Sequence, residues 1–201
     1  MFCTKCGNQL ADDARFCTKC GNQVGAAPAA AAAPGLVRLY MDAKGLTLMN
    51  YKFEIRDHLG YLRYRAATVT ESMVRYNARL YYPNDTEAMA IHQQKKMTMV
   101  AMNFDIVTPN GALVTEAIQE VKMTSFTYHL PQLGIRLDGD FFALNFMFYR
   151  NGQAIGRLSK KLMAWGDCYE LEFNDPSLEQ VLLSSIMVIQ MVIAAHRHRR
   201  R

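Results

Sequence analysis

Four cysteines near the start of the chain have the spacing of a metal site. They are Cys3, Cys6, Cys17 and Cys20, and they form two CxxC motifs separated by ten residues, each followed directly by a glycine. Two such motifs can direct four thiolates at one ion, and four thiolates complete the tetrahedral coordination of structural Zn²⁺ sites. A four-cysteine site leaves no open position for water or substrate. The spacing therefore predicts one Zn²⁺ ion with a structural role rather than a catalytic one.

Two other interpretations of these cysteines compete with zinc. Iron in a rubredoxin-like site is the first, because sulfur ligands alone do not choose between the two metals. Two disulfides are the second. The first residues lack the basic and apolar pattern of a secretory signal, so we expect a reducing compartment, in which disulfides are rare. Zinc in a cytoplasmic protein is therefore the interpretation that the cysteines favour.

The cysteines lie in a short internal repeat, in which "FCTKCGNQ" occurs twice within residues 1–24. This segment resembles the zinc ribbons at the start of many bacterial and archaeal proteins, and such ribbons can bind nucleic acid or protein. Its three basic and two acidic side chains give +1, and four thiolates with one Zn²⁺ add −2, so the loaded ribbon carries about −1. We therefore expect a protein contact or a spacer role rather than DNA binding.

A linker follows the ribbon at residues 25–35, with the sequence "GAAPAAAAAPG". It has no charged or large apolar side chain, and its two prolines interrupt any alanine helix. It cannot form a core. The sequence therefore predicts a ribbon and a larger domain, residues 36–195, that move independently.

The net charge of +5 does not indicate nucleic-acid binding once it is divided along the chain. The four arginines of the tail, residues 196–201, supply four of the five positive charges, and the ribbon supplies the fifth. The large domain is therefore neutral and has no basic surplus for phosphates. The tail itself either solubilises the end of the chain or contacts an acidic surface.

Residues 36–175 have the pattern of antiparallel hairpins, with β-branched and aromatic residues between turn signals. The turn signals are "DAKG" from Asp42, "DHLG" from Asp57, "TPNG" from Thr108, "LDGD" from Leu137 and "RNG" from Arg150. Residues 44–60 and 95–111 align without gaps, and a weaker third copy lies at residues 145–152. Repeated hairpins predict a sheet closed into a barrel or sandwich, which leaves no edge unpaired.

Alternation along the predicted strands indicates which side chains face the core. The inward candidates are Phe53, Ile55, Phe104, Ile106, Leu144, Phe146 and Phe148. Polar or charged residues separate many of them, so we expect core packing rather than an aromatic ligand cage. Met97, Met99 and Met102 are expected to fill gaps in the same core.

The end of the chain predicts an apolar helix at about residues 176–195. Asp175 or Ser177 can cap it, and Pro176 suits its first turn. Its residues are apolar nearly all round, so hydrocarbon must surround it. It is a marginal membrane span, because a span needs about 20 mainly apolar residues. It is also long enough, at roughly 30 Å, to cross a small barrel.

A resemblance favours the second arrangement. The order of a hairpin with F-x-I-x-D-x-x-G (Phe53, Ile55, Asp57, Gly60), a "FDIVTPNG" hairpin, a "GRLSKKLMAWGDCYELEF" segment and an apolar helix resembles the LURP-one-related family over about residues 36–195. That family is similar in fold to the phospholipid scramblases and to the C-terminal domain of Tubby proteins. The resemblance implies a mainly β protein, a closed antiparallel barrel of about twelve strands around a central hydrophobic C-terminal helix.

No catalytic motif stands out, so we expect a protein that is not an enzyme. The five histidines are scattered, and Cys168 lies in a predicted strand with aromatic neighbours, where a buried, inert thiol is expected. Asp138 and Asp140 flank Gly139 in a predicted turn, with too few further oxygen ligands for calcium.

The sequence thus predicts a non-enzymatic, zinc-binding protein of two modules, in which the barrel recognises a lipid headgroup or a protein partner. The neutral domain weakens the lipid version, because anionic headgroups attract clustered lysine and arginine. Lys95–Lys96 and Lys160–Lys161 are the local basic pairs, and solvated strand ends explain both. The alternative is a membrane-associated or tail-anchored, scramblase-like protein that handles lipids. A nucleic-acid-binding ribbon would need a basic face that the charge count does not show. We expect a cytoplasmic location, either free or peripheral at a membrane surface.

Overall fold

The computed structural model describes Gln9 and residues 35–47, 50–72, 75–94, 101–121, 126–140, 145–163 and 166–199. The chain divides into two compact units, Met1–Pro34 and Gly35–Arg201. The cysteines of the predicted metal site lie outside the described residues, as do Met97, Met99 and Leu144. The fold described below is that of the second unit.

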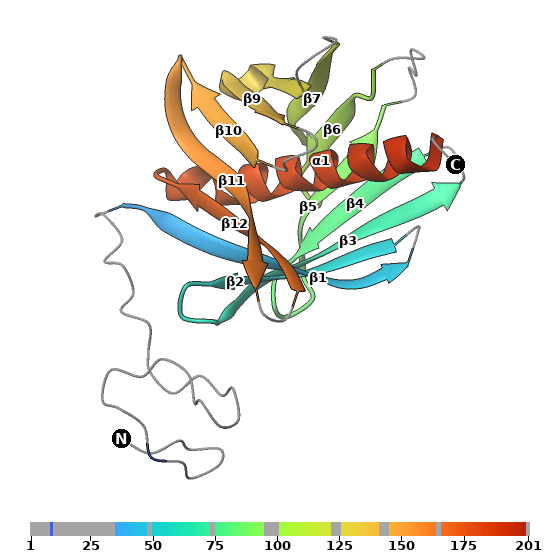
Figure 1. Cartoon of the computed structure of the whole chain (residues 1–201). Helices are drawn as coiled ribbons and strands as arrows, with labels where there is room; N and C mark the ends of the chain where they lie inside the picture. Colours follow the sequence, from blue (N-terminus) through green and yellow to red (C-terminus); the bar gives the residue numbers. More distant parts are fainter. Residues whose placement is uncertain are drawn as a thin grey trace. The chain divides into compact units, whose positions relative to one another are not determined.

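The described strands close into one antiparallel barrel (Figure 1). They are β1 (Val37–Thr47), β2 (Asn50–Asp57), β3 (Leu62–Ser72), β4 (Arg75–Tyr81), β5 (Glu87–Gln93), β6 (Phe104–Val107), β7 (Leu113–Val121), β8 (Phe126–Leu130), β9 (Ile135–Asp140), β10 (Asn145–Arg150), β11 (Gln153–Met163) and β12 (Gly166–Phe173). Each strand pairs with its neighbours in sequence, and β1 pairs with β12 to complete the circle. The predicted closed barrel of about twelve strands is confirmed.

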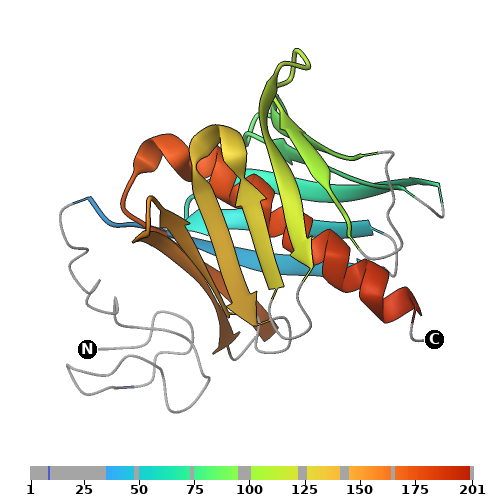
Figure 2. The same cartoon turned by 90° about the horizontal axis from the view of Figure 1, so that it is seen from above.

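A single long helix follows β12 and runs through the barrel (Figure 2). A short 3₁₀ turn, η2 (Pro176–Leu178), leads into α1 (Glu179–Arg199), and the Asp175 carboxylate accepts a hydrogen bond from the Ser177 backbone N–H. Asp175 is therefore the cap. The helix continues past its predicted end at residue 195 and includes part of the predicted basic tail. Basic residues in a last helical turn are favourable, because they oppose the negative end of the helix dipole.

The barrel supplies the hydrocarbon that α1 requires. Pro176–His196 is long and apolar enough to cross a membrane, since a stretch of 18 residues within it has a mean hydropathy of 1.8, yet 94% of that stretch is buried inside the structure. Every side chain from Val181 to Ala195 is buried. The prediction of a buried central helix is confirmed.

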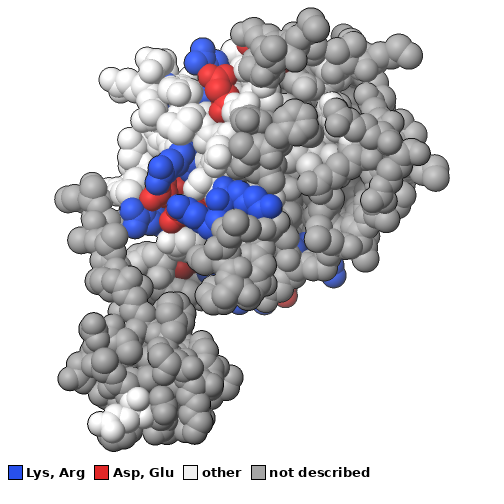
Figure 3. Space-filling view, in the orientation of Figure 1, with Lys and Arg blue, Asp and Glu red and all other residues white. Residues whose placement is uncertain are grey.

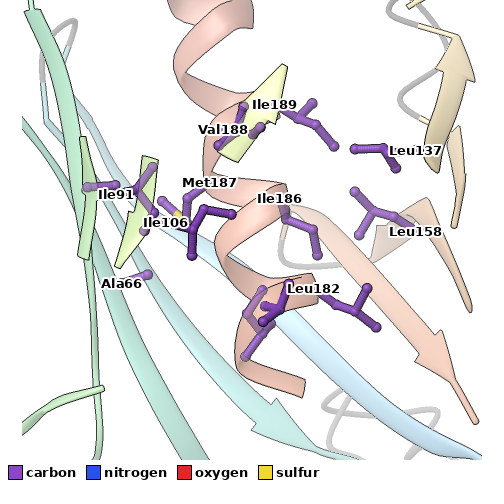
Figure 4. Close-up of a cluster of buried hydrophobic side chains, with 14 of the residues drawn as sticks. Ala66, Ile91, Ile106, Leu137, Leu158, Leu182, Ile186, Met187, Val188 and Ile189 are labelled. Carbon is purple, nitrogen blue, oxygen red and sulfur yellow. The ribbon is translucent and has the colours of Figure 1, made fainter. Parts of the chain in front are cut away.

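The helix packs on opposite walls of the barrel, which explains why it is apolar all round. Figure 4 shows Met187 directed toward Ile106 on one side, whereas Ile186 is directed toward Leu158 on the other. The inward side chains predicted by alternation are buried wherever the structure describes them. They are Phe53, Ile55, Phe104, Ile106, Phe146 and Phe148, with Met102 beside them. Helix and strands thus share one core.

The two copies of the long repeat build the same hairpin turn. In the first, the Asp57 N–H donates to the Tyr61 carbonyl at 3.0 Å and Gly60 is left-handed, with φ of 87°. In the second, the Thr108 N–H donates to the Ala112 carbonyl at 2.9 Å, and Gly111 has φ of 84°. These two predicted turns are confirmed, as is the turn after Arg150.

Two predicted turns are wrong, because their glycines serve strands instead. "DAKG" lies within β1, where the pairing with β2 shifts register between Lys44 and Thr47, as at a bulge. "LDGD" lies within β9, so Asp138 and Asp140 do not flank a turn. A Cβ on Gly139 would lie 2.1 Å from Cδ1 of Phe146, so this glycine makes room for a core ring.

We expect Gly139→Ala to lower the free energy of unfolding by about 1–3 kcal/mol, because the new methyl group overpacks the core. Urea unfolding measures the loss. Phe146→Leu is the partner variant, and in the double variant part of the cost of the alanine should disappear. Strictly additive losses would show that the ring is not what requires glycine.

Gln190 offers a second test of the core. Its side chain is buried within α1, and Nε2 has no hydrogen-bond partner in the part of the chain that the structure describes. Because an unpaired buried amide costs free energy, we expect Gln190→Met to raise the free energy of unfolding by about 1 kcal/mol. Gln180→Met is the matched control, since Gln180 Nε2 donates to Tyr82 Oη at 2.6 Å. Equal effects of the two substitutions would contradict this account.

Candidate functional sites

The predicted metal ligands Cys3, Cys6, Cys17 and Cys20 form the first candidate site. Four thiolates in two CxxCG motifs fit Zn²⁺ by the chemistry of the donor set. Bound zinc would supply a fold-stabilising crosslink between the two motifs rather than a reactive centre. Gly7 and Gly21 follow the motifs, where turns of this kind often require a positive φ.

Cys168 has the buried position that its sequence context predicts. It lies in β12 with 2% of its surface exposed. Burial, followed by a hydrogen bond with Asp42, raises the pKa of the thiol to about 12. The thiol is therefore protonated at neutral pH and is a poor nucleophile.

The other polar residues singled out from sequence are separated in the structure. Asp138 accepts a hydrogen bond from Thr127 Oγ1 and pairs with Arg136 at 2.7 Å. His129 lies 3.1 Å from Glu120 on the neighbouring strand. Among the residues that the structure describes, no group of three His, Cys, Asp or Glu side chains could hold a metal ion.

A cluster that sequence reasoning missed crosses β1, β12 and β11 on the outside of the barrel, and we call it the seam cluster because it spans the closing strand pair. Figure 3 shows Lys and Arg side chains gathered around acidic ones on this face. Its members are Arg38, Tyr40, Arg157, Lys161, Glu170 and Glu172. The alternation in "YELEF" places both glutamates opposite the core-facing Tyr169, Leu171 and Phe173.

Glu172 is the centre of the seam cluster. Its carboxylate accepts a hydrogen bond from Arg38 Nε at 2.7 Å and another from Arg157 Nε, with 9% of its side chain exposed. Burial acts to raise the pKa of this carboxyl, but the hydrogen bonds from the two arginines outweigh it and hold the pKa below its ordinary value. Glu172 is therefore an ionised, immobilised carboxylate.

Glu170 forms the next row of the seam cluster. It accepts from Tyr40 Oη at 3.1 Å and pairs with Lys161 at 3.0 Å. Burial and the nearby Glu170 charge raise the pKa of Tyr40. The two rows bind the first strand of the barrel to its last two strands by side chains as well as by backbone hydrogen bonds.

The comparisons with known proteins support both parts of the architecture. A family model for the zinc-ribbon domain matches residues 2–24, a range that contains all four proposed ligands. The search of curated proteins found no match for this sequence. The barrel is similar to the X-ray structure of a protein from Arabidopsis thaliana, with a TM-score of 0.56 and 12% identity, over 80% of this chain and 93% of that one. At this identity the likeness shows a shared fold.

We expect Cys3→Ser to release zinc without destabilising the barrel, because Met1–Pro34 and Gly35–Arg201 are separate compact units. Elemental analysis gives the zinc content, and thermal unfolding followed by tryptophan fluorescence gives the stability of the barrel. Cys168→Ser is the matched control and should retain zinc. A lower melting temperature of the barrel in Cys3→Ser would contradict the independence of the two units.

Cys168 should resist alkylation in the folded protein. Because its pKa is about 12, we expect iodoacetamide near neutral pH to react roughly a thousand-fold more slowly than after unfolding in urea. Mass spectrometry of the peptide that contains Cys168 separates it from the ribbon cysteines. Similar rates in the folded and unfolded states would show that the thiol is accessible.

Proposed function

We infer that this chain is a non-enzymatic binding protein of two modules, a zinc ribbon and a β-barrel whose outer surface recognises a lipid headgroup or a protein partner. One observation carries the inference. The fifteen consecutive residues from Val181 to Ala195 are buried inside the barrel, so α1 occupies the space that ligand-binding barrels leave for a ligand. Recognition is therefore assigned to the outside of the barrel and to the ribbon.

The same architecture supports the family that we propose for the barrel. A closed barrel of twelve strands around a C-terminal helix is what the resemblance to the LURP-one-related family implies. The phospholipid scramblases and the C-terminal domain of Tubby proteins are similar in fold to that family. We therefore assign residues 36–195 to a LURP-one-related, Tubby-like domain, with the ribbon on its Ala/Pro linker as a second point of contact in the cytoplasm.

The chemistry of the described side chains supports binding rather than catalysis. Cys168 is buried with a raised pKa, and Glu172 is ionised and held by two arginines. A nucleophile or general base must instead be accessible and have a pKa suited to the reaction. Both groups are thus better suited to holding the fold than to attacking a substrate.

A tail-anchored, scramblase-like protein is the second candidate. The length of Pro176–His196, and the mean hydropathy of 1.8 over 18 residues within it, favour this candidate. This candidate requires the barrel to lose its core. Insertion of α1 into a bilayer would remove the side chains that fill the barrel, and each large cavity in a core lowers the stability of the fold by several kcal/mol. Peripheral association with a membrane surface keeps the helix in place and is compatible with the binding role.

Fractionation of cells without detergent tests the proposed function against the second candidate. The pellet is washed with high salt and then at alkaline pH. We expect the full-length protein in the soluble fraction or released by salt, because α1 is already surrounded by the barrel. Retention through the alkaline wash would mean that the helix is inserted, and it would overturn the proposed function.

A further inference from the structure

The seam cluster contains two guanidinium groups with an unusual pattern of hydrogen bonds. Six other arginines with ion pairs in the described chain, Arg56, Arg63, Arg65, Arg79, Arg136 and Arg150, all use a terminal nitrogen, Nη1 or Nη2. Arg38 and Arg157 use Nε instead. Within the described part of the chain, the terminal nitrogens of Arg38 and Arg157 thus make no hydrogen bond.

Glu172 fixes these two groups relative to each other. Arg38 Nε donates to one of its oxygens and Arg157 Nε donates to the other. One nearly buried carboxylate therefore holds both guanidinium groups on a rigid sheet, with 25% of the Arg38 side chain and 54% of the Arg157 side chain exposed. Because the two guanidinium groups are already fixed by Glu172, their N–H donors lose little conformational entropy when a ligand binds.

A third cation, Lys161, lies on β11 two register positions beyond Ser159. Lys161 pairs with Glu170, and 43% of its side chain is exposed. Ser159 lies between Arg157 and Lys161 in the sequence of β11, and its Oγ, which is buried from solvent, has no hydrogen-bond partner among the described residues. Three positive side chains against two carboxylates leave the cluster with a small positive surplus.

We propose that Arg38 and Arg157 form a binding site for a phosphate monoester on the outer face of the barrel, with Lys161 as the third positive charge. The paired terminal N–H groups of a guanidinium match the oxygens of a phosphate, and two such groups suit a dianion better than a single lysine does. Glu172 is a positioning residue that presents the two arginines. The site deepens the proposed binding role, on which it rests.

The test uses the full-length protein, inorganic phosphate and isothermal titration calorimetry at constant ionic strength. Arg157→Lys keeps the charge beside Glu172 but removes the second pair of N–H donors. We expect it to weaken phosphate binding by about ten-fold or more, because hydrogen bonds between charged groups are lost. Arg56→Lys is the matched control, since the terminal nitrogens of Arg56 already bind Glu54 and the Gly60 carbonyl; it should bind as the wild type does.

Vesicle flotation distinguishes the two sources of the phosphate. Phosphatidylcholine vesicles that contain phosphatidic acid present a monoester, whereas vesicles with phosphatidylserine present only a diester. Flotation of the wild type and of Arg56→Lys with phosphatidic acid, but not of Arg157→Lys, would assign the site to a lipid headgroup. Binding of free phosphate without flotation would assign it to a soluble phosphorylated ligand.

The site is overturned if the wild type does not bind phosphate, or if Arg157→Lys and Arg56→Lys bind it equally well. Thermal unfolding of both variants shows whether the fold is kept. Failure of this site leaves the proposed function standing, because a protein partner and the fractionation result do not depend on it.

Discussion

The structure depends on the need of one apolar helix for hydrocarbon on every side. The residues from Val181 to Ala195 cannot face water, and the inward side chains of the strands cannot be left around an empty space. The strands shield the helix from water, and the helix fills the space that the strands enclose. The barrel closes around α1 because β1 pairs with β12, so the first and last strands and the helix that follows must come together for any part to be stable.

This arrangement moves the functional chemistry outward. The interior is occupied by a helix, so polar groups with the freedom to bind lie on the outer faces of strands. The seam cluster illustrates the consequence, because Glu172 stabilises the join between β1, β12 and β11 while it aligns two arginines toward solvent. One interaction thus contributes to closing the barrel and to preparing a surface for an anionic ligand. The ribbon belongs to the other compact unit.

Local patterns predicted much of this from sequence. Alternation identified Phe53, Phe104 and Phe148 as core side chains, and the structure confirms all three. The zinc ligands were also predicted from local spacing, but they lie outside the described residues and stay a prediction. The structural role of each glycine could not be predicted from sequence. Gly60 allows the left-handed conformation of a turn, whereas Gly139 lies in a strand and leaves space for the ring of Phe146. The turn from Tyr82 to Thr86 was missed because its left-handed position is occupied by Asp85, whereas the predicted turns all contain a glycine.

The seam cluster could not be predicted, since Arg38 and Glu172 are 134 residues apart and meet only through strand register. Hydrogen exchange of the full-length protein tests the shared core most directly. If α1 and the barrel fold as one unit, the amides of residues 183–193 should exchange only with global unfolding, at the rate of the slowest amides in β1 and β12. Faster exchange of α1 while the strands stay protected would contradict this account.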